Sequence, residues 1–324
     1  MREPRPFLYP LLRGAAVGAL VALLYSVALA DATAPPTTVT PADPAWEALQ
    51  AVYAYDNTLP TDPVIVEQTQ SAQMVTRRLT LAAHDGERIP ATMHLPLGDG
   101  PFPCVLLLHG YGGNADDYST VAAALLVPRG IAVMAIDARL HGRRAQEGVE
   151  MWSADLERSR QATINTVIDN RRALDYLDTL DCIDHSRYMA LGLSMGAIMG
   201  AVLGPVDERI GSAALIVGGG DFSGLLANSD LPQVRRIREA GITDEMLEDF
   251  AEGLEPTQFI GHFGRPLLLI NGRDDEIVPP ANAEALHVAA SEPKTIVWYD
   301  GGHVPAPAML FGPLMQFVGA NLLN

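Results

Sequence analysis

The sequence has little lysine and little cysteine, and both shortages limit what the protein can bind. Lys294 is the only lysine, and the 22 basic residues are outnumbered by 39 acidic ones, for a formal net charge of −17. Nucleic-acid binding needs clustered lysine and arginine, so we expect no nucleic-acid partner. Cys104 and Cys182 are too few for a zinc site or a disulfide scaffold. They form either one disulfide or two separate thiols.

Motifs for metals and cofactors are also missing. The chain has no HExxH pattern and no clustered Cys and His spacing, so we expect neither a metal nor an organic cofactor. Apolar side chains, in contrast, are abundant, because 48% of the 324 residues are hydrophobic. This proportion supports a sizeable buried core and excludes global disorder.

The first thirty residues differ from the rest of the chain. Arg2, Arg5 and Arg13 precede an apolar run over residues 15–30 that ends in Ala-Leu-Ala. A charged start, a short apolar stretch and small residues at a cleavage point describe a secretory signal. The alternative is an uncleaved membrane anchor, although a spanning helix usually needs about 20 apolar residues. We therefore expect residues 1–30 to direct export, either secreted or periplasmic, or anchored with the main domain outside the cytoplasm.

A linker and a large domain are expected after this segment. Residues 31–45 are rich in Pro, Thr and Ala, which is typical of a flexible linker. The main domain is expected over residues 46–324, beginning with a short amphipathic helix over 46–55. A β-hairpin is predicted over residues 74–96, because two runs with β character flank an Asp-Gly turn signal.

Short apolar runs then alternate with helical patterns. These runs lack the polar alternation of half-exposed strands, so they are expected to be buried on both faces of a sheet. Alternating strands and helices predict an α/β fold with a mostly parallel central sheet and helices on both faces. The expected strands are residues 103–110, 131–137, 187–193, 212–219, 265–272 and 294–302, and the expected helices include 114–130 and 155–180.

Residues 220–263 interrupt this alternation. Their pattern indicates two short helices between one expected strand and the next. The segment follows the carboxyl end of a strand, where ligands bind in open parallel sheets. We interpret it as a small helical cap over the site, the alternative being an ordinary surface excursion.

A candidate nucleophile lies in the stretch GLSMG, residues 192–196. The stretch falls between an expected strand and a helix rich in small residues. In such an elbow the serine has strained backbone angles, and the flanking glycines avoid collisions with neighbouring backbone. Ser194 would then be exposed at the carboxyl end of the sheet, beside the positive end of the following helix.

A base and an acid that orients it follow later in the chain. His303 lies in a glycine-rich loop directly after an expected strand, where an imidazole can reach Ser194. Asp274, Asp275 and Glu276 all follow another strand end. The spacing G-x-x-D-x-x-V-P selects Asp275, with Asp274 as the alternative. The order Ser, Asp, His matches that of the α/β-hydrolase triad.

Two backbone amides are predicted to stabilise the developing oxyanion. One is the N–H of Met195, directly after the nucleophile, and the other is expected from the glycine-rich loop HGYGGN at residues 109–114. Tyr111 is the expected second donor through its main chain. His109 is expected to shape this loop, and His141 and Arg143 to pack beside it without acting as catalysts.

Taken together, these motifs resemble those of the α/β-hydrolase superfamily over roughly residues 75–324. Within it the chain is most similar to the esterase, dienelactone-hydrolase-like and prolyl-oligopeptidase-like branches. Ser194 stands where dienelactone hydrolases have a cysteine, Ala197 stands where many relatives have glycine, and the N-terminal region is too short for the propeller of prolyl oligopeptidases. The motifs quoted for the resemblance are HGYGG (109–113), DARLHGR (137–143), GLSMG (192–196), GRDDEIVP (272–279) and GGH (301–303).

The resemblance implies an exported serine hydrolase that cleaves small-molecule carboxylic esters through an acyl-enzyme. A peptidase, amidase or thioesterase with the same triad is the alternative within enzymes. From another class, the alternative is a non-catalytic binding protein that retains the fold. Membrane attachment through residues 15–30 stays open, and the sequence does not define an oligomeric state.

Overall fold

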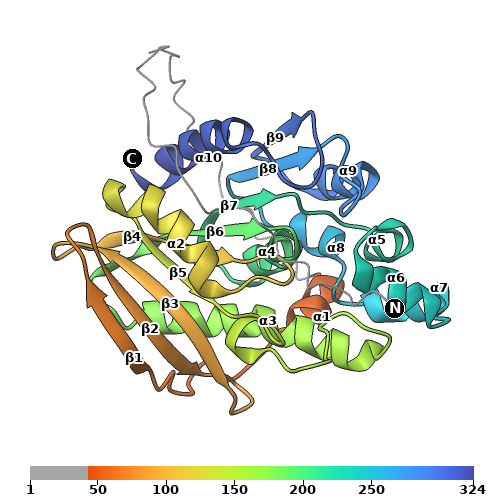
Figure 1. Cartoon of the computed structure of the whole chain (residues 1–324), viewed down its shortest axis with the longest axis horizontal. Helices are drawn as coiled ribbons and strands as arrows, with labels where there is room; N and C mark the ends of the chain where they lie inside the picture. Colours follow the sequence, from red (N-terminus) through yellow and green to blue (C-terminus); the bar gives the residue numbers. More distant parts are fainter. Residues whose placement is uncertain (1–42) are drawn as a thin grey trace, which may run out of the picture. The chain divides into compact units, whose positions relative to one another are not determined.

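The computed structural model describes residues 43–324, and they contain a nine-stranded sheet (Figure 1). Its order is β1-β2-β3-β5-β4-β6-β7-β8-β9. The first three strands and β5 pair antiparallel, whereas all pairs from β5 to β9 are parallel. The strands are β1 (Val64–Gln70), β2 (Met74–Ala82), β3 (Arg88–Pro96), β4 (Phe102–Leu108), β5 (Ala132–Ile136), β6 (Ile183–Leu193), β7 (Ile210–Ile216), β8 (Leu267–Gly272) and β9 (Lys294–Tyr299).

Helices cover both faces of the sheet, which confirms the predicted α/β-hydrolase architecture (Figure 1). Consecutive residues of β4 show how the layers form, since Leu106 packs into one core and Leu107 into the other. Such strands have no polar face, as the continuous apolar runs predicted. The helices are α1 (Pro44–Val52), α2 (Ala115–Leu126), α3 (Leu156–Leu177), α4 (Met195–Val206), α5 (Phe222–Asn228), α6 (Pro232–Glu239), α7 (Asp244–Ala251), α8 (Pro256–Ile260), α9 (Pro280–Ala289) and α10 (Pro307–Leu322).

Local signals place several of these elements. The side chain of Asn114 caps α2 by accepting a hydrogen bond from the N–H of Asp117. Gly130, at φ 79°, ends the 3₁₀ turn that follows α2. The hairpin predicted over residues 74–96 is β2 and β3. The predicted helix at 46–55 is α1, which begins slightly earlier, at Pro44.

Three features differ from the sequence-based expectation. The segment over residues 220–263 holds four helices, α5 to α8, where two were predicted. Each is five to eight residues long, too short to show a clear helical period. The edge strand β1 was not predicted, because its sequence VIVEQTQ lacks the alternation of a half-buried strand, and all of its residues are exposed. The helices α9 and α10 were not predicted individually either, and α10 contains Pro313.

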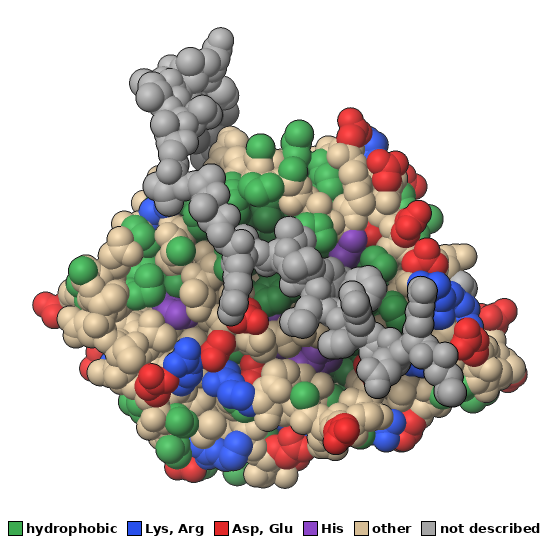
Figure 2. Space-filling model, in the orientation of Figure 1, with side chains coloured by type: hydrophobic (Ala, Val, Ile, Leu, Met, Phe, Trp, Pro, Cys, Tyr) green, Lys and Arg blue, Asp and Glu red, His purple; other side chains and the backbone are tan. Residues whose placement is uncertain are grey.

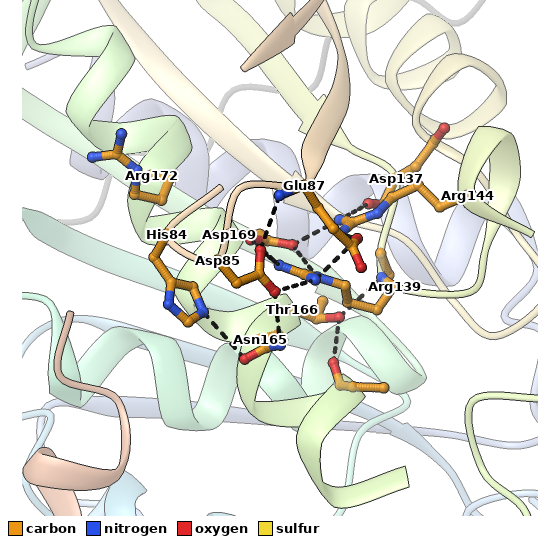
Figure 3. Close-up of polar contacts among 12 residues, drawn as sticks. His84, Asp85, Glu87, Asp137, Arg139, Arg144, Asn165, Thr166, Asp169 and Arg172 are labelled. Atoms are coloured by element: carbon orange, nitrogen blue, oxygen red, sulfur yellow. Dashed lines mark hydrogen bonds and ion pairs between the residues drawn. The ribbon is translucent and has the colours of Figure 1, made fainter. Parts of the chain in front are cut away.

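A network of buried ion pairs ties the β2–β3 turn to the loop after β5 and to α3 (Figure 3). The Asp169 carboxylate, with no exposed side-chain surface, accepts from Arg139 Nε at 2.7 Å and from Arg144 Nη1 at 2.7 Å. Asp85, in the turn, accepts from Arg139 Nη1 at 2.7 Å. Burial raises the pKa of Asp85, but hydrogen bonds and charge from Arg139 outweigh it and hold the pKa below its usual value.

Some expectations fall outside what the structure describes. The predicted signal or anchor at residues 1–30, and most of the linker at 31–45, lie outside residues 43–324. Within the described residues, none of the helices has the length and apolar content needed to span a bilayer. Cys104 and Cys182 are both free thiols. On the face drawn in Figure 2, basic side chains lie in small groups among acidic ones, without a continuous basic patch among the described residues.

Candidate active site

Ser194 occupies a sharp turn between β6 and α4. Its φ of 54° and ψ of −117° are unusual for a residue with a side chain, and its N–H donates to the Ile216 carbonyl at 2.8 Å. A Cβ added to Gly192 would lie 2.4 Å from a backbone oxygen, and one added to Gly196 would lie 2.1 Å from the carbonyl oxygen of Leu108. The two glycines are therefore sterically required, as the motif predicted.

Ser194, His303 and Asp275 form a continuous chain of hydrogen bonds. His303 Nε2 lies 2.8 Å from Ser194 Oγ, and His303 Nδ1 lies 2.8 Å from Asp275 Oδ2. Since a carboxylate only accepts, Nδ1 carries the proton and Nε2 accepts from the serine hydroxyl. This tautomer lets the imidazole take the proton of Ser194.

The carboxylate of Asp275 is buried and held in place. Its Oδ1 accepts hydrogen bonds from the N–H groups of Ile277 and Val278, both at 2.9 Å. These bonds leave Oδ2 aimed at His303. Asp274, the alternative, is exposed and uses its own N–H to bond the Gly301 carbonyl at 3.0 Å. The structure therefore brings Asp275, and not Asp274, against the imidazole.

The loop that carries His303 is fixed by a residue that sequence reasoning missed. Tyr299 Oη donates to the Gly302 carbonyl at 2.6 Å. A Cβ on Gly272, at the end of β8, would lie within 2.6 Å of the carbonyl oxygens of Gly301 and Gly302. The histidine loop thus packs directly on the end of β8. The tyrosine lies four residues before the histidine, but nothing in that spacing alone indicates its role.

The loop at residues 109–114 lies against the turn that holds Ser194. A Cβ added to Gly110 would be 3.6 Å from the Cβ of Ser194. Tyr111 and Met195, the two predicted oxyanion donors, line the same pocket as Ser194. Their role as backbone donors stays a prediction.

His109 braces this loop and has no free ring nitrogen. Its Nδ1–H donates to the Gly110 carbonyl at 2.8 Å, so Nε2 accepts from the Ala138 N–H at 3.0 Å. Burial lowers the pKa of His109 to about 4, only partly opposed by the Gly110 bond. The ring is therefore neutral near pH 7 and unsuited to act as a base, in line with its expected role in loop shape.

The stretch after β5 supports the same loop. Asp137, fully buried, accepts from the Ala115 N–H at 2.7 Å and from Arg143 Nε at 2.7 Å. Ala115 is the first residue of α2, directly after the loop. His141 donates through Nδ1 to the Arg139 carbonyl at 2.9 Å and packs edge-on against the ring of Tyr111. These contacts agree with the expected packing role of His141 and Arg143.

An apolar pocket opens above Ser194. Its empty space is about 350 Å³, with open solvent at its mouth included. No charged side chain lines it, so it suits an uncharged group. Its walls are Tyr111, Trp152, Ser194, Met195, Ile198, Phe222, Leu225, Leu226, Ser229, Leu231, Val234, Ile277 and Val278.

Most of this pocket wall was not predicted residue by residue. Phe222 to Val234 belong to the predicted cap at 220–263, but Trp152 and Ile198 come from other segments. Within residues 43–324, no group of three or more His, Cys, Asp and Glu side chains is arranged to hold a metal ion.

Comparisons with known proteins concern the family and the fold. The family model "Esterase FrsA-like" matches residues 61–234. Esterase FrsA of Salmonella paratyphi B is 30% identical over 121 residues, which cover 37% of this chain and 26% of that protein. The chain thus matches only about a quarter of the length of this curated relative.

Solved structures share the fold. An acetyl xylan esterase from Paenibacillus sp. R4 superposes with a TM-score of 0.74 at 19% identity, covering 89% of this chain and 97% of that one. Acetyl xylan esterase 1 from Thermoanaerobacterium sp. JW/SL YS485 gives 0.71 at 18% identity, covering 84% and 92%. At these identities the likeness concerns the fold alone.

Proposed function

The chain belongs to the FrsA-like esterase family, whose model matches more than half of it, and from this premise we propose that it is a serine hydrolase of small-molecule carboxylic esters. The observation that carries the proposal is the hydrogen-bonded chain of Ser194, His303 and Asp275, with 2.8 Å at both contacts to the imidazole. A strained serine, a base and an orienting acid at these distances form the arrangement needed for acyl transfer.

In the proposed reaction, Ser194 Oγ attacks the ester carbonyl carbon while His303 Nε2 takes the hydroxyl proton. The resulting oxyanion accepts hydrogen bonds from the backbone N–H groups of Met195 and Tyr111. Each such donor is worth about 3–4 kcal/mol in the transition state. The positive end of α4 adds to this stabilisation because the helix begins directly after Ser194.

The tetrahedral intermediate then expels the alcohol, which takes its proton from His303. The acyl group stays bonded to Ser194 Oγ. A water molecule attacks the acyl carbon, and His303 again accepts a proton and returns it to Ser194 as the acid leaves. Asp275 orients the imidazole and stabilises the imidazolium in both steps.

The pocket defines the acyl group that we propose. Its lining is apolar and carries no charge, so a charged acyl group would lose its hydration without compensation. Its size favours short acyl chains over long ones. Export of the enzyme, or its attachment to a membrane, belongs to the proposal as well and rests on the sequence of residues 1–30.

Hydrolysis of p-nitrophenyl esters over a range of acyl lengths tests this function, with Ser194→Ala as the matched inactive variant. We expect turnover of short esters that the variant loses almost completely. Retention of more than a few per cent of the activity by Ser194→Ala would exclude the assignment of the nucleophile.

A fluorophosphonate probe separates the alternatives. Labelling of Ser194 without ester turnover would indicate a peptidase, amidase or thioesterase with the same triad. Neither labelling nor turnover would indicate a binding protein that retains the fold.

A further inference from the structure

One ion pair links the two walls of the acyl pocket. Arg236, on α6, donates from Nη2 to Glu150 Oε1 at 3.0 Å. Two residues away on each side, Val234 and Trp152 line the pocket. Within residues 43–324, this pair is the only polar contact between α6 and the segment 145–155. The residues through which these two walls line the pocket, Trp152 and Val234, are apolar.

The opposite side of the cap is anchored much more firmly. Ser229 Oγ donates to the Ile277 carbonyl at 2.7 Å, and Asn282 Nδ2 donates to the Gly220 carbonyl at 3.0 Å. Within the cap itself, the carboxylate of Glu255 accepts from the N–H of Asp221 at 2.9 Å. Ser229 and Asn282 are both buried. α6 is joined to this side of the cap through Arg238 Nη1, which donates to the carbonyls of Leu226 and Ser229 at 2.9 and 3.2 Å. Its ion pair with residues 145–155 is exposed, because 56% of the Arg236 side chain and 40% of the Glu150 side chain are accessible.

The same carboxylate reaches the predicted oxyanion loop. Glu150 Oε2 accepts from the phenol of Tyr111 at 2.7 Å, while Oε1 holds Arg236. Burial and the bond to Glu150 both raise the pKa of Tyr111, so the phenol stays a donor at any physiological pH. Its ring also packs against Trp152, with centroids 5.2 Å apart. A single carboxylate thus connects α6 with the residue whose backbone N–H is the predicted second oxyanion donor.

We propose that Glu150 and Arg236 form a clasp that sets acyl-chain selectivity, and that Glu150 also positions the oxyanion loop through Tyr111; this inference rests on the proposed esterase function. With the clasp closed, the pocket admits short acyl groups, and a longer chain requires α6 to move away from residues 145–155. An exposed ion pair shifts such an equilibrium by about two- to fivefold. The clasp is therefore a specificity device, and its loss leaves the fold intact.

The selectivity test compares Arg236→Ala with Arg235→Ala. Arg235 is a matched control because it is exposed on the same helix and bonds only the Asp230 carbonyl within the cap. We expect Arg236→Ala to raise the ratio of kcat/KM for p-nitrophenyl octanoate over acetate by about two- to fivefold. Glu150→Gln should do the same, and Arg235→Ala should leave the ratio unchanged. An unchanged ratio in Arg236→Ala overturns the selectivity claim.

The positioning test uses Tyr111→Phe, which removes the phenol and leaves the ion pair in place. Loss of a hydrogen bond to a charged group changes an equilibrium constant by roughly tenfold or more. We therefore expect kcat to fall by about three- to tenfold, with KM and the octanoate-to-acetate ratio unchanged. A kcat equal to that of the parent protein overturns the positioning role of Glu150.

Hydrogen exchange makes the clasp testable independently of catalysis. Arg236→Ala should speed amide exchange in residues 229–239 and 145–155, whereas Arg235→Ala should not. Unchanged exchange in both segments overturns the clasp even if the parent protein hydrolyses esters. The proposed function is contradicted if the parent protein neither hydrolyses esters nor is labelled at Ser194 by the fluorophosphonate. In that case, faster amide exchange in Arg236→Ala would still support the contact between Glu150 and Arg236.

Discussion

Replacing Asp275 by asparagine isolates the role of the carboxylate with almost no change in shape. The side chain makes three contacts: two backbone N–H groups at 2.9 Å to Oδ1 and His303 Nδ1 at 2.8 Å to Oδ2. In Asp275→Asn the amide oxygen keeps both backbone donors, because nothing else there can accept them. The amide NH₂ group then faces His303 Nδ1 and forces that nitrogen to become an acceptor.

The consequence for catalysis follows from the tautomer. When Nδ1 accepts, the proton resides on Nε2, which then cannot take the proton of Ser194. The loss of this step is expected to lower kcat by about 10⁴-fold, the effect of the same change in a serine protease. Folding should change little, because the shape and both backbone hydrogen bonds are retained.

The assay is turnover of p-nitrophenyl acetate, with thermal unfolding measured on the same samples. Asp274→Asn is the matched control, since Asp274 is the neighbouring carboxylate and is exposed. The control should keep kcat within about threefold of the parent protein. Retention of more than about 1% of kcat by Asp275→Asn, or an equal loss in Asp274→Asn, would refute the assignment of the orienting acid.

Three other predictions concern stability. Gly196→Ala should prevent correct formation of the elbow, because its Cβ would lie 2.1 Å from a carbonyl oxygen of β4, and should lower the free energy of unfolding by more than about 3 kcal/mol. The control is Gly312→Ala on α10, where an added Cβ meets open space; thermal melts should show an unchanged or higher Tm for it. Asp169→Asn should lower the free energy of unfolding by about 3 kcal/mol or more, because it removes the charge that pairs with two buried arginines. Asp62→Asn, at an exposed ion pair, should lower it by under about 1 kcal/mol; urea unfolding measures both. Burial lowers the pKa of His94 to about 4, so the unfolded chain binds this proton first as pH falls. The contribution of His94 to stability is therefore intact above about pH 6.5 and falls by about 3 kcal/mol as the pH drops to about 4. In His94→Gln, the free energy of unfolding should vary less steeply with pH over this range. An unchanged slope would contradict this prediction.

The sheet and the candidate triad could be predicted because both have local signals. Buried strands such as β4 and β8 are continuous apolar runs, and Ser194, Asp275 and His303 each follow the end of a strand. In a parallel sheet those ends meet at one edge, so residues distant in sequence converge without any information on their pairing.

Other parts of the site have no local signal. The contact between Glu150 and Arg236 joins residues 86 positions apart, and both lie in polar segments that resemble ordinary surface. The network of Arg139 and Asp169 is similar, because a sequence does not reveal which of many arginines and carboxylates are buried together. The cap could be located from the interruption of the strand–helix alternation, but its four helices were too short for their number to be predicted.

The candidate site has a rigid part around Ser194, His303 and Asp275 and a less firmly held part at the pocket wall. This difference has a chemical reason. The proposed reacting groups and the loop beside them are fixed by buried hydrogen bonds, such as those of Asp275 to two backbone amides and of Asp137 to the first residue of α2. Catalysis by preorganised groups requires this, because a displacement of about 1 Å costs about 10²-fold in rate. In the proposed reaction the acyl group takes no part in proton transfer, so the proposed acyl pocket can be closed by apolar side chains and by the exposed pair of Glu150 and Arg236. A wall of this kind can adapt to acyl groups of different size while the nucleophile, base and acid keep their positions.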